Sequence, residues 1–317
     1  MKKTTFSLTL AICLASCLIC NSAFGQKPLD RQHVRTMVVP ISIFTKQELK
    51  ENQLDEYVQA ERLVVKEDNE EQEILSIRSV GVSPLSIAIL IQEDLSSTFN
   101  LQLKDIEGFI RSQPRGTRVM VGYLRAGSMQ IRQKFTDDLE KAAKSLRVVA
   151  SNASSAPRSP YDGVDEALGK FDALPNGRRA ILLFSDGLDS TQGLSPESII
   201  QSLDLDRATL KAQRKGVAIY SFYFPATYTQ TDSSSAILGA QSALEKLSEE
   251  SGGRAFFQGS IAPLSFEPYF KQLIIALNRQ FALTYLSTHM QKGYHKLNVQ
   301  STNPNVKIIH PKGYYYR

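Results

Sequence analysis

Cysteine is scarce in this sequence of 317 residues, and its three copies all lie within the first 20. They are Cys13, Cys17 and Cys20. A chain cut after residue 25 would therefore have no disulfide, no thiolate metal site and no cysteine nucleophile. Such a protein must be held together by its core alone. The hydrophobic content of 42% and the charged content of 22% are typical of a globular protein that can build one.

The motifs of common enzyme classes are also missing. The sequence contains no Gly-x-Ser-x-Gly elbow, no His-Glu-x-x-His helix, no phosphate-binding Gly-x-x-x-x-Gly-Lys loop and no dinucleotide fingerprint after its first strand-helix junction. Ser96 or Ser185 would lack a base, because the four histidines (His33, His289, His295 and His310) all lie outside residues 83–281. We therefore expect a protein that is not an enzyme, with a hydrolase as the least favoured alternative.

A long basic run with interleaved aromatic residues is absent as well. The formal net charge of +5 falls to +3 if Lys2 and Lys3 are removed with the N-terminus, which is a mild charge for such a chain. Nucleic acid is therefore not an expected partner.

The N-terminus has the pattern of an export signal. Lys2 and Lys3 precede an apolar run over residues 6–19, and small residues follow at 21–25, so residues 1–25 are predicted to be a signal peptide cleaved before Gln26. Leu14-Ala15-Ser16-Cys17 also resembles a lipobox, which would leave a lipidated Cys17. We expect an exported protein, periplasmic or secreted, or alternatively a lipoprotein anchored in the envelope. Membrane attachment is expected only through Cys17 or an uncleaved signal.

The periodicity of apolar residues divides the remaining chain into three parts. Residues 26–82 form an N-terminal β segment, residues 83–281 alternate strands with helices, and residues 282–317 return to β segments. The alternation predicts an α/β domain with a doubly wound, mostly parallel sheet. The C-terminal β segment is expected to pack with residues 35–82 as a small β-rich domain built from both chain ends.

Individual elements can be predicted from the same patterns. In the α/β part, strands are expected at 84–92, 118–125, 129–135, 178–184, 217–224 and 254–258, and helices at 99–112, 139–148, 161–174, 195–215, 236–251 and 263–281. Outside it, strands are expected at 36–44, 62–66, 73–80, 282–289, 295–301 and 306–310. Pro40 places the first of these at an edge or a bulge.

Polar residues follow two of the apolar strands. Gln92 to Thr98 comes after the strand at 84–92, and Ser185-Asp186-Gly187 comes after the strand at 178–184. Open α/β sheets bind ligands beyond the carboxyl ends of their strands. Carboxylate and hydroxyl oxygens that converge there could hold Mg²⁺. The alternative is structural: a Ser or Thr would cap the helix near Phe99, and Asp186-Gly187 would be a turn.

The α/β part resembles a von Willebrand factor A domain, and the whole exported chain resembles the bacterial VWFA-related domain proteins. The motifs that carry the resemblance are Gln92 to Thr98 after its strand, Gly116 to Leu124, Ser159-Pro160-Tyr161-Asp162 and Leu182 to Gly187. Outside the domain, residues 64–74 resemble the leading hairpin of that group, and residues 293–315 resemble its closing strands. The resemblance covers nearly all of the chain after residue 25.

The resemblance implies a degenerate metal-ion-dependent adhesion site. If the first strand ends at Ile91, the family's Asp-x-Ser-x-Ser loop falls on Gln92, Asp94 and Ser96. If the strand continues through Glu93, the loop falls on Asp94, Ser96 and Thr98. Asp186 matches without adjustment, whereas the family's threonine falls near Ser159, beside Arg158. The candidate ligands of Mg²⁺, or of Mn²⁺ or Ca²⁺, are therefore Asp94, Ser96, Thr98, Ser159 and Asp186. A guanidinium at Arg158 would repel such an ion and could take its place.

The resemblance further implies a protein-binding or adhesion module. Its partner would be a protein of unknown identity, recognised through loops at 92–98, 150–160 and 187–194. Gln92, Arg158 and Asp189 are the candidate partner-binding residues. The alternative is a metal-independent structural scaffold of the envelope.

Overall fold

The computed structural model describes residues 34–45, 63–78, 84–151, 158–175, 177–191, 195, 198–199, 201–226 and 234–316. The predicted signal peptide, Cys17 and the polar stretch at 46–62 lie outside these residues. Within the described residues, no helix is long and apolar enough to cross a membrane.

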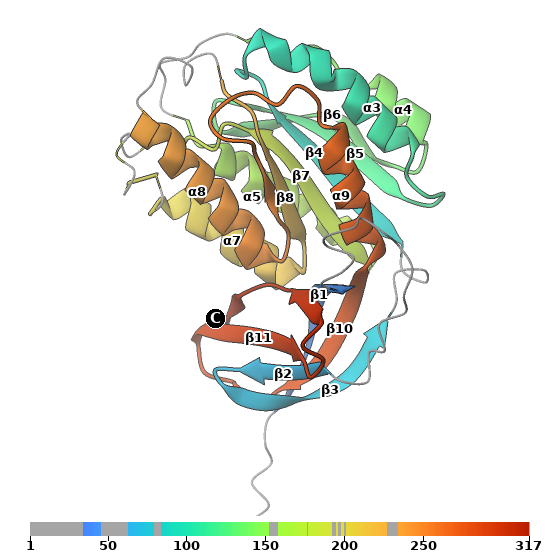
Figure 1. Ribbon diagram of the computed structural model, residues 1–317, viewed down its shortest axis with the longest axis vertical. Coiled ribbons are helices and arrows are strands. Elements are labelled where there is room, and N and C mark those ends of the chain that lie inside the picture. The colour runs from blue at the N-terminus through green and yellow to red at the C-terminus, as the bar shows by residue number, and fades with distance from the viewer. Residues whose placement is uncertain are drawn as a thin grey trace, which may run out of the picture. The chain divides into compact units, whose positions relative to one another are not determined.

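Six strands form one sheet in the order β6-β5-β4-β7-β8-β9 (Figure 1). They are β4 (Leu85–Gln92), β5 (Arg118–Arg125), β6 (Ser128–Thr136), β7 (Arg178–Ser185), β8 (Ala218–Tyr223) and β9 (Ala255–Phe256). Five of the strands run parallel, and β6 joins β5 antiparallel at the edge. The sheet is therefore mixed. Together with the helices on it, it confirms the α/β class predicted from the alternation of strands and helices.

Helices pack against both faces of this sheet. Alternate residues of β4 point to opposite faces. Ile87, Ile89 and Ile91 pack with one core cluster, and Ala88 and Leu90 pack with the other. The first cluster includes residues of η3 (Ser97–Gln102), α3 (Leu103–Arg111), α4 (Leu139–Lys144) and α9 (Glu267–Asn278). The second cluster includes residues of α5 (Pro160–Lys170), η4 (Phe171–Ala173), α7 (Leu203–Lys215) and α8 (Ser234–Ser251). Burial on both faces explains why β4 and β7 are almost continuously apolar.

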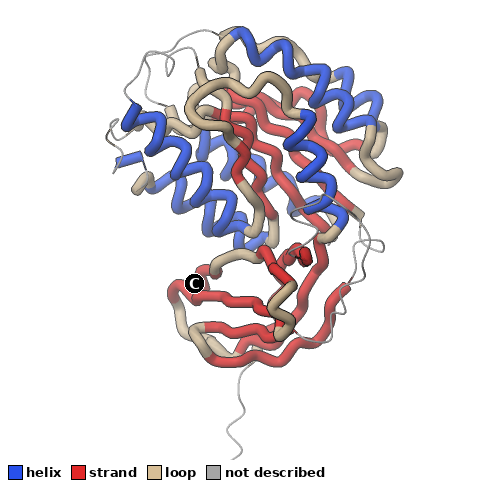
Figure 2. Tube along the Cα trace, in the orientation of Figure 1, coloured by secondary structure: helices blue, strands red, loops and turns tan. Residues whose placement is uncertain are grey.

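A second sheet contains seven strands, all antiparallel, in the order β12-β1-β10-β3-β2-β11-β13. The strands are β1 (Arg35–Thr45), β2 (Leu63–Glu67), β3 (Glu70–Arg78), β10 (Gln280–Ser287), β11 (Gly293–Ser301), β12 (Val306–Ile309) and β13 (Gly313–Tyr316). Strands from the two ends of the chain are interleaved in this order: β1, β3 and β2 come from the N-terminal part, and β10, β11, β12 and β13 come from the C-terminal part. Figure 2 shows the helices beside the six-stranded sheet, whereas the described residues around the antiparallel sheet are strands and loops.

Several element boundaries differ from the predictions. The last helix ends at Asn278 rather than at 281, because β10 already begins at Gln280. In the region of the helix expected at 195–215, Ser198 and Ile199 are helical, and the Ser195 side chain accepts from Ser198 N. α7 begins separately at Leu203, where the Ser202 side chain caps it by accepting from Leu205 N. The periodicity did not predict β13, although the resemblance places closing strands within residues 293–315. Pro40 lies inside β1, which pairs with β12 only from Ser42 to Thr45, so the missing N–H of Pro40 does not interrupt that pairing.

An aromatic cluster positions the loop that follows β4. The ring of Phe99 is fully buried and packs edge-on against Phe184 and Phe224, with ring centroids 5.9 and 5.2 Å apart. Because Phe184 lies on β7, this contact ties the start of η3 to the end of the neighbouring strand.

Candidate functional site

The polar ends of β4 and β7 lie side by side, because the two strands are parallel neighbours. The side-chain amide of Gln92 joins them. Its Nε2 donates to Asp94 Oδ1 at 2.8 Å and to Asp186 Oδ1 at 2.9 Å. Its Oε1 accepts hydrogen bonds from Ser185 Oγ and from the backbone N–H of Asp186. Both donor positions and both acceptor positions of the amide are thereby used.

Arg158 places a cation against the same two carboxylates. Its Nε lies 2.8 Å from Asp94 Oδ2, and its Nη2 donates to Asp186 Oδ2 at 3.2 Å. Arg158 is only 7% exposed and Asp186 is fully buried. The backbone of Arg158 is held by Ser190, whose N–H donates to the carbonyl of Arg158 at 2.9 Å. The guanidinium therefore has a fixed place between the loops that follow β4 and β7.

The electrostatics of the site are centred on Asp186. Burial raises the pKa of Asp186 to about 6; the charge of Arg158 and the hydrogen bond from Gln92 lower it, while the charge of Asp94 raises it further. The N–H of Leu188 also donates to Asp186 Oδ1 at 3.1 Å. Arg158, Gln92 and Leu188 thus favour the charged form of this carboxylate, but burial outweighs them.

The structure brings together only some of the candidate ligands. Asp94 and Asp186 meet, through Gln92 and Arg158. Ser96 Oγ and Thr98 Oγ1 instead lie 2.9 Å from one another and share a hydrogen bond. β4 ends at Gln92, and Glu93 and Asp94 form a turn, so the strand does not continue through Glu93 as the second alignment of the loop requires.

Ser159 follows Arg158 in the chain, and Asp189 lies in the loop after β7; both residues are buried. Ser159 is buried at the N-cap of α5, and its Oγ has no hydrogen-bond partner. Asp189 is 2% exposed, and its carboxylate accepts from the side chains of Thr191 and Ser202. Asp189 therefore connects the loop after β7 to the N-cap of α7.

These residues do not fit a divalent cation. Mg²⁺ requires about six oxygen ligands at close range. Here, each carboxylate of the pair already contacts one guanidinium nitrogen and one amide N–H. The described part of the chain also contains no group of three or more His, Cys, Asp or Glu side chains that could hold a metal. The positive charge of the site is supplied by the protein itself.

A cavity of about 410 Å³ opens beside this pair. Its lining includes Gln92, Asp94 and Arg158, together with Glu93, Arg125 and Arg147. Glu93 forms an ion pair with Arg147 and lies 3.8 Å from Arg125. The side chain of Arg125 is 67% exposed, so it is the cation of the cavity that solvent reaches most easily.

Glu93, Arg125 and Arg147 were not among the site residues predicted from the sequence. Arg125 could have been found, because it ends β5, the strand next to β4, and the ends of parallel strands share one edge. Arg147 had no such signal, since it lies after α4 outside any strand. Tyr161 was not predicted to have a role in the site; its buried hydroxyl donates to the carbonyl of Gly187 at 2.8 Å and holds the turn after Asp186.

A second buried polar cluster lies in the antiparallel sheet. Glu67 is fully buried, and its Oε1 accepts from Ser287 Oγ at 2.9 Å and from the hydroxyl of Tyr314. His289 Nδ1 lies 3.6 Å from the same oxygen. These contacts connect β2, β10 and β13, which are distant in sequence.

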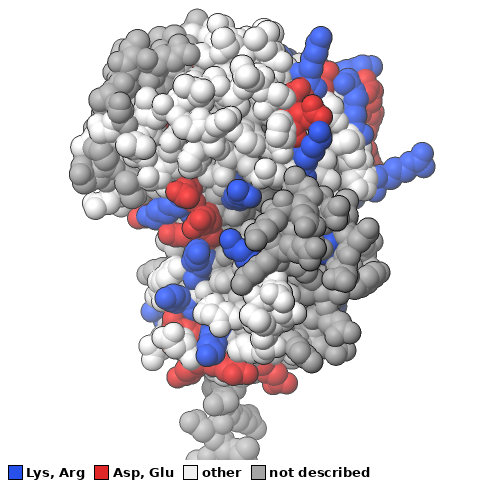
Figure 3. Space-filling view, viewed as in Figure 1, with Lys and Arg blue, Asp and Glu red and all other residues white. Residues whose placement is uncertain are grey.

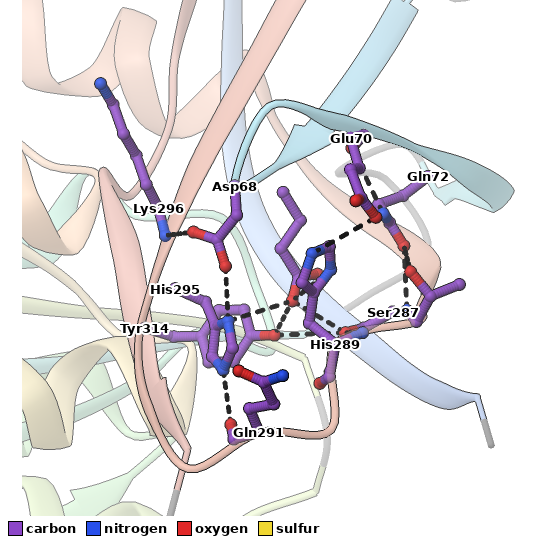
Figure 4. A network of polar contacts seen from close by, with 11 residues as sticks. Asp68, Glu70, Gln72, Ser287, His289, Gln291, His295, Lys296 and Tyr314 are labelled. Atoms are coloured by element: carbon purple, nitrogen blue, oxygen red, sulfur yellow. Dashed lines mark hydrogen bonds and ion pairs between the residues drawn. The ribbon is translucent and has the colours of Figure 1, made fainter. Parts of the chain in front are cut away.

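His295 extends this cluster to the β2–β3 turn. Figure 4 shows its ring between Asp68 and Gln291. Nδ1 lies 2.7 Å from Asp68 Oδ2, and Nε2 lies 2.7 Å from the carbonyl of Gln291. Asp68 Oδ1 accepts from the N–H of Lys296 at 2.8 Å. Asp68 and the following Asn69 have positive φ angles of 50° and 74°, as a two-residue hairpin turn requires.

Charged side chains on the face in Figure 3 are interspersed, and neither sign covers a large continuous area there. Acidic atoms gather at the end where β2 and β3 lie in Figure 1.

No protein-family model and no curated protein matches the sequence. Among solved structures, the conserved hypothetical protein BatB from Bacteroides thetaiotaomicron is 13% identical, with a TM-score of 0.45, over 61% of this chain and 98% of its own. The vWF domain of the type V pili tip protein Mfa5 from Porphyromonas gingivalis is 11% identical, with a TM-score of 0.40, over 61% and 94%. The manganese-loaded TRAP protein from Plasmodium vivax is 9% identical, with a TM-score of 0.40, over 80% and 100%. The chain is thus similar to structures of von Willebrand factor A domains, the family that its sequence motifs predict.

Proposed function

We propose that this protein is a non-enzymatic binding module that recognises a protein partner through the loops at the C-terminal edge of a doubly wound sheet. The observation that carries the proposal is the contact of Arg158 with both Asp94 and Asp186. An internal guanidinium in this position removes the need for a bound ion, so recognition is metal-independent.

The partner contacts the rim of the 410 Å³ cavity rather than the buried pair. Arg125 offers a solvent-exposed guanidinium there, and Arg147 lies beside it with Glu93 as its ion-pair partner. Exposed arginines at the mouth of a cavity are common anchors in protein interfaces. Gln92, Arg158 and Asp189 hold the loops in shape and act as positioning residues.

A titration with Mg²⁺ and with Mn²⁺ tests the metal-independent form of this function. Calorimetry on the purified chain should give no saturable heat, and the melting temperature should not rise at millimolar metal. A one-to-one binding isotherm with either ion would overturn this part of the proposal and would favour an adhesion site that needs a cation.

Binding itself can be tested with the immobilised protein and an extract of envelope proteins. Capture of a partner should persist in EDTA and should fall at least about tenfold with Arg125→Glu, because the charge at the rim is reversed. Arg115→Glu is the matched control: Arg115 is exposed in the turn before β5, at the other end of that strand. Equal loss with both variants would exclude the rim as the contact surface.

We also propose that the protein is exported, with residues 1–25 as the signal. Mass spectrometry of the N-terminus of the protein from cells should find Gln26 as the first residue. A lipidated Cys17 would instead indicate an envelope anchor, and an intact Met1 would contradict export by cleavage.

A further inference from the structure

Another, larger cavity lies at the start of β7, at the opposite end of this strand from the candidate site. Its volume is about 810 Å³. Small-molecule sites occupy roughly 300–1,000 Å³, so the cavity has a suitable size for one. One wall comes from β1, β3 and β10 of the antiparallel sheet, and the other includes the start of β7 and the C-terminal end of α7. The proposed function makes no use of this cavity.

The wall formed by the antiparallel sheet combines hydroxyl and apolar groups. Thr284 in β10 pairs with Val38 in β1 and with Ser76 in β3, and all three residues line the cavity. Directly opposed residues of antiparallel strands point to the same face of a sheet, so these three side chains share one surface. Val38 is 55% exposed, and Leu75, which also lines the cavity, is 47% exposed. The wall therefore offers hydroxyl groups next to apolar groups that are about half exposed.

Two buried glutamines of the lining have amide atoms without a hydrogen-bond partner among the described residues. Gln280, at the start of β10, is 1% exposed, and both its Nε2 and its Oε1 are unpaired. Gln213, in α7, donates from Nε2 to the carbonyl of Glu250 at 3.0 Å, but its Oε1 is unpaired. Buried polar groups are nearly always paired in folded proteins, so unpaired amides in the wall of a cavity indicate that water or a ligand binds there.

The donors and acceptors of these amides restrict the chemistry of the ligand. Gln280 Oε1 and Gln213 Oε1 only accept hydrogen bonds, whereas Gln280 Nε2 only donates them. A carboxylate or a phosphate dianion supplies acceptors but no donor, so it would leave both carbonyl oxygens unpaired. An ammonium group supplies donors but no acceptor. A hydroxyl group does both, so a molecule that carries several hydroxyls can pair with both glutamines.

The arginines in the other wall do not require an anion. Arg178 Nη1 donates to the carbonyl of Leu277 at 3.2 Å, and Arg179 Nη2 donates to the carbonyl of Leu174 at 3.2 Å. Both arginines therefore have partners inside the protein. Guanidinium N–H groups donate to the oxygen of a hydroxyl as well as to that of an anion, so these side chains are compatible with a neutral ligand.

We propose that this cavity binds a small polyhydroxylated molecule, namely a mono- or disaccharide. Hydroxyl groups of the sugar exchange hydrogen bonds with the amides of Gln280 and Gln213, and another contacts Thr284. The C–H groups of the sugar ring pack on Val38 and Leu75, which are only half covered by the protein. The cavity is separate from the loops at the C-terminal edge of the six-stranded sheet, so this inference does not depend on the proposed function.

Calorimetric titration of the purified chain with glucose, N-acetylglucosamine and maltose tests this site. At least one sugar should bind with one-to-one stoichiometry and a Kd below about 10 mM. Tetrahydropyran-2-methanol, which has the ring of glucose but a single hydroxyl, should bind at least about tenfold more weakly, because it leaves amide groups of the site unpaired. Inorganic phosphate should not displace the sugar. The inference is overturned if no sugar binds, if the analogue binds as tightly, or if phosphate competes.

Two variants place the sugar in this cavity. Gln280→Leu removes the unpaired amide and should weaken binding by about tenfold or more. Because none of the described residues pairs with this amide, the melting temperature of Gln280→Leu without sugar should be equal to or higher than that of the wild type. Thr284→Val removes one hydroxyl, keeps the shape of the side chain and should weaken binding by about threefold.

The matched control is Gln102→Leu. Gln102 is also buried, but it lies in η3, away from the cavity, and donates to the carbonyl of Leu264 at 3.0 Å. Its replacement should lower the melting temperature and leave the affinity for the sugar unchanged. Equal weakening of binding by Gln280→Leu and Gln102→Leu would overturn the inference. A larger drop in melting temperature for Gln280→Leu than for Gln102→Leu would do the same, because the amide of Gln280 would then be paired within the protein.

Discussion

Arg158 Nη2 donates to Asp186 Oδ2 at 3.2 Å in a place that solvent does not reach. The pair links the segment before α5 to the end of β7. Because the same guanidinium also contacts Asp94, a single cation is shared by two carboxylates. Burying a charged side chain away from water costs free energy. The buried ion pair is therefore stable only while both Arg158 and Asp186 are present.

Replacement of Arg158 by methionine should therefore destabilise the protein strongly. Arg158→Met keeps much of the apolar stem but leaves Asp94 and Asp186 without a cation. Loss of one partner of a buried ion pair typically costs about 3–5 kcal/mol. Urea unfolding at pH 7 measures the change. Arg115→Met, at an exposed turn, should change the free energy of unfolding by no more than about 0.5 kcal/mol. Similar values for the two variants would show that the pair contributes little.

The raised pKa of Asp186 predicts a dependence of stability on pH. Its pKa rises from 3.8 to about 6 in the folded protein, so between these values the folded state binds more protons than the unfolded state. The contribution of Asp186 is fully present below pH 4 and is lost as the pH rises through about 6. In Asp186→Asn this contribution is absent. The difference in unfolding free energy between the variant and the wild type should therefore change between pH 4.5 and 7, and parallel curves would contradict the prediction.

The sequence was informative about this site where strands decide the geometry. Gln92, Asp94 and Asp186 follow apolar runs, and the ends of adjacent parallel strands must meet. Arg158 was also recognised as a cation that could replace a metal. The hydrogen bonds of Gln92 to both carboxylates were not predictable, because they depend on the point where β4 ends, which periodicity does not locate. Arg147 was not predicted, because no sequence pattern shows where a long side chain on a loop points.

Prediction of the antiparallel sheet had a similar limit. The strands at 36–44, 62–66 and 73–80 were recognisable from alternation, and so were those at 295–301 and 306–310. β13 was not recognised from periodicity, because a glycine followed by three tyrosines shows no alternation of apolar and polar residues. Its role becomes clear only in three dimensions, where the hydroxyl of Tyr314 donates to the buried Glu67.

Two histidines in this part of the chain, His295 and His310, should respond to pH in opposite ways. Burial lowers the pKa of His295, but its hydrogen bonds to Asp68 and Gln291 and the charges of Asp68 and Glu67 outweigh this, and the pKa is raised above 6.5. For Asp68, burial raises the pKa, but the bonds from His295 and Lys296 outweigh it, and the pKa falls below 3.8. The pair thus stabilises the fold most between about pH 4 and pH 6.5, and the share of His295 is lost as the pH rises.

The pKa of His310 is shifted in the opposite direction to that of His295. Burial, with the charge of Lys312, lowers the pKa of His310 below 6.5 despite its hydrogen bond to the carbonyl of Pro311. Its neutral ring accepts from Val299 N at 3.2 Å. His295→Gln should therefore cost more stability at pH 5.5 than at pH 8.5, whereas His310→Gln should cost less at pH 5.5. Thermal unfolding at both pH values gives the comparison, and the same sign for the two variants would refute it.

Two glycines differ in how closely the backbone approaches them. A Cβ on Gly253, just after α8, would lie 1.9 Å from the carbonyl oxygen of Ile219 in β8 and 2.6 Å from its carbon. Backbone atoms of a central strand cannot move aside, so Gly253→Ala should lower the free energy of unfolding by about 2–4 kcal/mol. On Gly169, within α5, a Cβ would meet no atom within 4 Å. Gly169→Ala should therefore raise stability by about 0.5–1 kcal/mol, because alanine loses less backbone entropy in a helix.

Urea unfolding of the two alanine variants decides whether α8 packs against β8 as closely as described. The same change from glycine to alanine should lower the free energy of unfolding at position 253 and raise it at position 169. A general effect of alanine could not produce opposite signs at the two positions. If Gly253→Ala were as stable as the wild type, the turn after α8 would have to stand further from Ile219. The hydrogen bond from Ile219 N in β8 to Ser251 Oγ, at 3.0 Å, would then not hold the end of α8 against the sheet.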